Sequence, residues 1–119
     1  MYQDEGYDPN NEKHVEIAEK LAVDRRERAL SDVREILALP SGRRLFWKYL
    51  TECGIFKSSF TGNNTTFFNE GKREVGLRLL NDMTEAVPEA FLLMQQEEAK
   101  RDANEKNKLI KEIKDVRTS

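Results

Sequence analysis

The chain has 119 residues, of which 35% are charged and 38% hydrophobic, and its net charge at pH 7 is −2. This length allows at most one domain, and the low apolar content with interleaved charges predicts a small core that carries solvated helical segments. A single cysteine, Cys53, excludes a disulfide framework and fits a reducing cytoplasm. No apolar run is long enough to span a membrane, and the first residues do not resemble a secretory signal.

Residues 1–10 are expected to form a flexible acidic tail, because they contain three acids and no base. Residues 11–30 then predict a charged helical arm, which Asn10 or Asn11 can cap and in which residues 24–28 are charged all round. Apolar residues take up helical spacing only from Leu30 onward, so the core domain is predicted to cover residues 31–94. The pattern is compatible with one long helix or with two abutting helices before residue 40.

Pro40 is expected to end that helical region and to open the next helix, because proline suits the first turn of a helix but not its interior. The second helix should reach Cys53 and close on Gly54 in a left-handed conformation. Its predicted apolar stripe, with Trp47 largely buried beside it, consists of Leu45, Phe46, Tyr49, Leu50 and Cys53.

Residues 54–66 are the one substantial loop, and Ile55, Phe56 and Phe60 are expected to turn back into the core. Asn64, Thr65 or Thr66 is expected to cap the third helix. The predicted inner face of that helix comprises Phe67, Phe68, Val75, Leu79, Leu80 and Met83. Gly71 and Gly76 each weaken a helix, so both are expected to permit close approach of a neighbouring helix and to face the region of Trp47.

Pro88 is expected to begin the last helix, and residues 95–119 predict a charged C-terminal helical arm. Its small apolar stripe is formed by Leu109, Ile113 and Val116, which lie at positions i, i+4 and i+7. A long polar helix has little reason to stay ordered alone, so this arm should fray or pack on a partner. The predicted fold is all-α, a domain of three or four helices with long charged helical arms at both ends.

No catalytic, cofactor-binding or metal-binding residues are predicted. The only histidine, His14, lies in an arm and is expected to be solvated, and the SSFTGNN segment lacks the spacing of a Walker-type phosphate loop. An enzyme with a small-molecule substrate is therefore not expected.

The strongest binding candidates are Arg43, Arg44 and Arg73, whose guanidinium groups suit carboxylates or phosphates. The alternative for these arginines is internal bonding to loop carbonyls or to Glu70. Residues 40–80 hold seven bases and three acids, whereas residues 81–99 hold five acids and no base. Contact with DNA or with an acidic protein surface is compatible with that basic stretch.

Several motifs occur in order along the central part of the chain. They are Pro40, Gly42, Arg43 and Arg44, then C-G-x-F-x-S-S-F-T-G from Cys53 to Gly62, F-x-E-G-x-R-x-x-G from Phe68 to Gly76, and P-E-A-F from Pro88 to Phe91. Over residues 29–98, this arrangement resembles the Bbp-nineteen-like phage domain family, small proteins of tailed bacteriophages and prophages.

The resemblance implies a small bacteriophage structural or assembly protein, placed in the portal or tail region or inside the virion, with no enzymatic activity. Its implied partners are other virion proteins, and its location is the virion or the host cytoplasm during assembly. The two arms, by their composition, are expected to pack on a copy of this protein or on a neighbouring virion protein. The contact surfaces expected are the three arginines and the stripe of Leu109, Ile113 and Val116. The alternative is an accessory nucleic-acid-binding protein in DNA packaging or ejection.

Overall fold

The computed structural model describes residues 6–118, so Ser119 and the first half of the predicted acidic tail lie outside it. Four helices make up the described chain: α1 (Glu12–Leu37), α2 (Pro40–Glu52), α3 (Thr65–Ala86) and α4 (Ala90–Thr118). No strand occurs among residues 6–118. The all-α prediction with long helical ends is confirmed.

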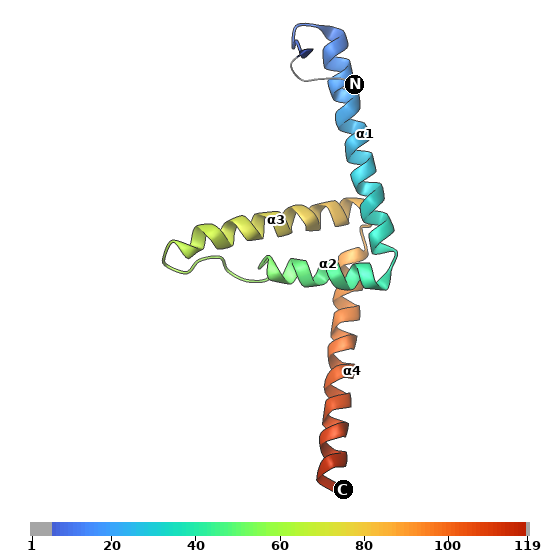
Figure 1. Cartoon of the computed structure of the whole chain (residues 1–119), viewed down its shortest axis with the longest axis vertical. Helices are drawn as coiled ribbons and strands as arrows, with labels where there is room; N and C mark the ends of the chain where they lie inside the picture. The colour runs from blue at the N-terminus through green and yellow to red at the C-terminus, as the bar shows by residue number, and fades with distance from the viewer. Residues whose placement is uncertain (1–5, 119) are drawn as a thin grey trace.

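The helices form an elongated molecule with a side branch. Helices α1 and α4 extend in opposite directions along the long axis, and α2, α3 and their connecting loop project sideways as a limb (Figure 1). The radius of gyration is 21.6 Å, against roughly 13–14 Å for a compact chain of this length. The accessible surface is 9414 Å², where a compact monomer would expose roughly 6,700 Å². Much of the chain is therefore open to contact.

Helix α1 is one continuous helix, which decides between the two arrangements that the sequence left open. The Asn11 side chain accepts hydrogen bonds from the Lys13 and His14 amides, at 3.0 and 3.4 Å, and caps the first turn. The preceding residues fold back on this turn, and the Asp8 amide donates to His14 Nδ1 at 2.9 Å. His14 is therefore partly covered at the surface, where it accepts this hydrogen bond.

A tight corner joins α1 to α2. Pro40 occupies the start of α2, as predicted. At Gly42, a β-carbon would lie 2.0 Å from the Ile36 carbonyl oxygen, so the two backbones touch where glycine stands. This close approach sets the direction in which the limb leaves α1.

The core is a small hub that draws on all four helices. Its buried members are Leu37, Leu50, Met83, Ala90 and Met94. Half-buried apolar residues surround them: Val33, Phe46, Trp47, Ile55, Leu79, Leu80 and Val87. A hub of this size should be only marginally stable.

The predicted stripe on α2 was partly wrong. Leu45 and Tyr49 are 48% and 47% exposed, while Leu50 is fully buried and Phe46 packs on the hub. Trp47 is partly buried and packs on the hub. Its ring packs against Phe56 and Phe91, with centroids 5.3 and 5.8 Å away.

The two glycines of α3, Gly71 and Gly76, differ in how closely other parts of the chain approach them. A β-carbon at Gly76 would lie 2.6 Å from Cys53 Cβ and 2.7 Å from Ile55 Cγ2, so the expected close approach is real, but it is made to the end of α2 rather than to Trp47. Nothing lies within 4 Å of a β-carbon at Gly71, so the prediction for that glycine was wrong.

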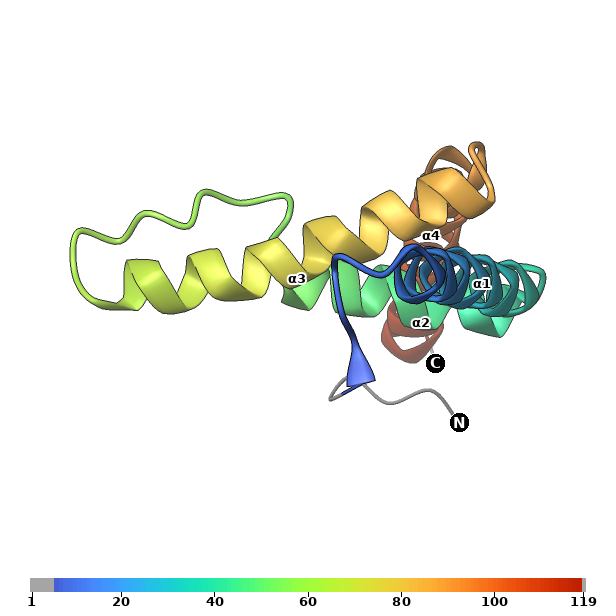
Figure 2. The ribbon, with the colours of Figure 1, turned by 90° about the horizontal axis from the view of Figure 1, so that it is seen from above.

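The loop between α2 and α3 runs outward along α3 instead of covering the hub (Figure 2). Gly54 adopts the predicted left-handed conformation, with φ of 76°. The first amide of α3, that of Thr65, donates to Asn63 Oδ1 at 2.9 Å, so Asn63 takes the capping role expected of its neighbours. Phe60 is 75% exposed, and its predicted return to the core was wrong.

Candidate interaction surfaces

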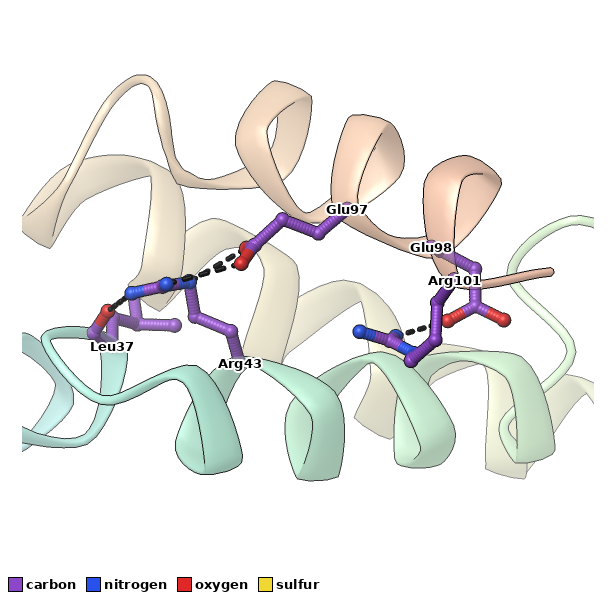
Figure 3. A network of polar contacts seen from close by, with 5 residues as sticks. All are labelled: Leu37, Arg43, Glu97, Glu98 and Arg101. Carbon is purple, nitrogen blue, oxygen red and sulfur yellow. Dashed lines mark hydrogen bonds and ion pairs between the residues drawn. The ribbon is translucent and has the colours of Figure 1, made fainter. Parts of the chain in front are cut away.

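Arg43 ties three helices together at the hub. Its guanidinium donates to both carboxylate oxygens of Glu97 on α4, at 2.6 and 3.1 Å, and to the Leu37 carbonyl oxygen at the end of α1, at 2.9 Å (Figure 3). The fork of an arginine suits such paired contacts. The hydrogen bond from Arg43 lowers the pKa of Glu97 and raises that of Arg43. The predicted binding residue Arg43 therefore has an internal role, with Glu97 in place of the suggested Glu70.

Arg43→Ala is expected to lower the free energy of unfolding by roughly 1–3 kcal/mol, because it leaves Glu97 and a carbonyl without their charged donor. Since the pKa of Glu97 is lowered in the fold, the stabilisation is present at neutral pH and disappears as the pH falls through that lowered value. The difference between the two proteins should thus shrink below about pH 4. Urea unfolding at several pH values measures it.

Arg44→Ala is the matched control, because Arg44 is exposed and lies next in the chain. Its effect should stay within roughly 0.5 kcal/mol. Equal losses in the two variants, or a loss for Arg43→Ala that does not change with pH, would contradict a stabilising contact between Arg43 and Glu97.

A second arginine, Arg26, holds the C-terminal half of α1 against α3. Arg26 donates to Asp82 at 2.7 Å and to Glu85, one turn further along α3. These hydrogen bonds, the one to Glu85 foremost, raise the pKa of Arg26. Contact between α1 and α3 therefore extends to Arg26, inside the stretch that the sequence assigned to a charged arm. The sequence contained a signal, two acids three residues apart on α3, but nothing in it named their partner.

These ion pairs change the surface charge expected from the sequence. Four of the five acids in residues 81–99 pair with arginines of the chain, since Glu98 also pairs with Arg101. Among the bases of residues 40–80, five make no ion pair with any described residue: Arg44, Lys48, Lys57, Lys72 and Arg73. These basic residues, without an ion pair to any described residue, consequently lie on the limb, including the start of α2 next to the hub.

The structure does not gather the three candidate arginines into one site. Arg43 and Arg44 stand in the first turn of α2, where Arg44 borders a shallow groove between α2 and α4 with Glu98 and Arg101. Gly76 of α3 packs at the opposite end of α2, near Cys53, so the half-buried Arg73 belongs to the outer half of the limb.

The outer end of the limb carries three exposed aromatic rings, which we call the limb tip. Phe60, Phe67 and Phe68 are 75%, 76% and 66% exposed. The loop beside them is closed by hydrogen bonds, because the Thr61 amide donates to Thr66 Oγ1 at 2.9 Å and the Asn69 side chain donates to the Ser59 carbonyl at 3.4 Å. The rings are thus presented by an ordered loop and the first turns of α3. All three rings were predicted to lie in the core, and that prediction was wrong.

A polar hollow lies behind the same loop. Its volume is about 240 Å³, and its lining includes Lys57, Ser58, Ser59, Asn69 and Lys72. The Lys72 ammonium also stands 5.1 Å from the centre of the Phe68 ring, so positive charge and exposed aromatic surface meet at the limb tip.

The predicted C-terminal stripe is exposed along the free end of α4. Leu109, Ile113 and Val116 line a shallow apolar groove that Glu112 and Arg117 border. Each of the three apolar side chains is more than half exposed. We call this the C-terminal face.

The fold and these surfaces define an elongated all-α protein with a small hub and apolar groups displayed on projecting elements. None of its helices within residues 6–118 is long and apolar enough to cross a membrane. In the same residues, no three His, Cys, Asp or Glu side chains are grouped as metal ligands.

Comparison with known families then gives the assignment. The family model of the Bbp19-like phage protein matches residues 33–96, which is more than half of the chain. The chain belongs to this family and is a phage protein. No curated protein and no solved structure matches it.

Proposed function

We propose that the protein is a non-enzymatic structural or assembly component of the phage particle, in the portal or tail region or inside the virion, and that it acts through contacts with other virion proteins. The limb tip is the observation that carries this proposal. Contiguous exposed apolar surface on a folded protein marks interaction sites. The three exposed rings, one on the loop and two on the first turns of α3, are the candidate for such a surface.

The energetics favour a partner that covers the rings. Burying one phenylalanine side chain contributes roughly 1.5–3 kcal/mol, so the limb tip offers several kcal/mol before the costs of association. Lys72 stands over the Phe68 ring, and Lys57 lines the same hollow as Lys72, so both favour a partner surface with carboxylates around an apolar pocket. The family assignment makes another phage protein the natural source of that surface.

Mass spectrometry of purified particles from the phage or prophage that encodes the chain tests this role. The unsubstituted protein should be present in mature particles or in precursor shells. A Phe67→Ser/Phe68→Ser variant should be incorporated roughly tenfold less or worse, because losing about 1.4 kcal/mol of contact already weakens binding tenfold. Both rings are exposed, so the variant should fold normally.

Val23→Ser provides the matched control, because Val23 is also an exposed apolar residue on a helix, 52% exposed, but lies outside the limb. It should enter particles as the unsubstituted protein does. Absence of the protein from both mature particles and precursors would refute a particle role. Normal incorporation of the limb-tip variant would refute the limb tip as the contact surface.

An accessory nucleic-acid-binding role in DNA packaging or ejection is the second candidate, and the polar hollow favours it. Lysines can hold phosphates while exposed aromatic rings stack on bases of a single strand. Sub-micromolar binding of single-stranded DNA at physiological salt, lost in Lys57→Ala/Lys72→Ala, would favour this role over the first. Weak binding that salt abolishes would favour protein contacts.

A further inference from the structure

The outer part of α4 stands clear of the rest of the protein. All residues from Asp102 to Thr118 are exposed, and this end of α4 extends away from the hub (Figure 1). The exposed stretch is roughly 25 Å long at 1.5 Å per residue. A solitary helix of this length is marginal in water, so contact with another helix would stabilise it.

The C-terminal face has the residue order of a coiled-coil seam. With Ile113 at position a of a heptad, Leu109 and Val116 fall at successive d positions. The two residues that border the groove then take the flanking positions, Glu112 at g and Arg117 at e. Opposite charges thus edge the seam at Glu112 and Arg117, while the preceding e position is Ile110, which is 50% exposed.

We propose that the C-terminal face binds the same face of a second copy of this chain, in a parallel two-stranded coiled coil. In a parallel pair, the g residue of one helix meets the e residue five positions later in the other, which places Glu112 against Arg117 of the second copy on both sides of the seam. A β-branched residue at a with leucine at d also favours two parallel strands; Ile113 and Leu109 provide that combination, and Val116 at the second d position does not.

The charges select the parallel orientation. An antiparallel pair brings g against g, and both g positions here, Glu105 and Glu112, are acidic. The seam is also short, because Asp102 and Lys106 occupy the preceding d and a positions and pair with each other at 2.9 Å. Pairing should therefore be weak in dilute solution and should strengthen where copies are concentrated together.

This inference names one partner within the proposed contact role, and it concerns a surface different from the limb tip. The particle experiment above tests the role, whereas cross-linking of the purified protein tests the pairing. The two can therefore fail separately.

Thiol cross-linking of the full chain in a Cys53→Ala background tests the pairing and its direction. Ile113→Cys places a thiol at position a, where two parallel helices bring the thiols within disulfide reach. Lys111→Cys is the matched control, because position f points away from the seam. We expect the first variant to form a covalent dimer at least roughly tenfold faster than the second under mild oxidation.

Charge exchange then tests the register. Adding Glu112→Lys to the Ile113→Cys variant should slow dimer formation severalfold, and further addition of Arg117→Glu should restore it. Equal rates for the thiols at positions 113 and 111 would show random collision and would overturn the proposal. Failure of the double exchange to restore the rate would overturn the parallel pairing of Glu112 with Arg117.

Discussion

Gly42→Ala is expected to destabilise the protein by roughly 3 kcal/mol or more, beyond the usual cost of overpacking a core. The added β-carbon would lie 2.0 Å from the Ile36 carbonyl oxygen and 2.8 Å from the carbonyl carbon. Both are backbone atoms, so relief requires the corner between α1 and α2 to open. That movement would pull Leu37 and Leu50 apart in the hub. Thermal or urea unfolding followed by circular dichroism measures the loss.

Gly71→Ala is the matched control, with an expected effect of opposite sign. Gly71 lies inside α3, and a β-carbon there meets nothing within 4 Å. Alanine should therefore stabilise the helix by roughly 0.5–1 kcal/mol. A destabilising Gly71→Ala, or a Gly42→Ala without effect, would show that the backbone contacts at these positions differ from those described.

Leu50→Ala should cost roughly 2–5 kcal/mol, the range for removing a large buried side chain. Leu50 is fully buried in the hub. A small protein has roughly 5–15 kcal/mol of stability in total, and this hub belongs at the lower end, so the variant should be partly unfolded at body temperature. Urea unfolding of the variant against the unsubstituted protein gives the difference.

Leu45→Ala is the matched control on the same helix. Both variants replace leucine by alanine, so a difference in their cost reports the burial of the side chain and not its helix propensity. Leu45 is 48% exposed, so its removal should cost less than about 1 kcal/mol. The sequence assigned both leucines to one apolar stripe. Similar losses of unfolding free energy for Leu45→Ala and Leu50→Ala would mean that the predicted stripe, and not the observed hub, forms the core.

The helix boundaries could be predicted because local chemistry determines them. Pro40 can begin α2 but cannot lie inside a helix, Asn11 supplies a capping oxygen, and Gly54 adopts a conformation that other residues resist. Each signal acts within a few residues. The order of the helices followed from such signals without knowledge of the packing. Their number was left at three or four, and the last helix begins at Ala90 rather than at the predicted Pro88.

The inward-facing residues were harder to predict, because periodicity ranks apolar positions without showing how many of them the hub can cover. Phe60, Phe67 and Phe68 look like core residues, yet the loop runs along α3 and leaves them outside. The few residues that form the hub are already covered by the four helices. The hub therefore has no surface left to cover these three rings. The partner of Arg43 was also unpredictable, because Glu97 lies 54 residues away in the chain.

The extension of α1 and α4 in opposite directions from a small hub affects how the molecule diffuses (Figure 1). The longest dimension is 80 Å, and the radius of gyration of 21.6 Å equals that of a compact protein of roughly 400 residues. A single copy should therefore elute early from a gel-filtration column, as a much larger globular protein does. An early peak would be compatible with a monomer, and the number of copies in it has to be read from light scattering.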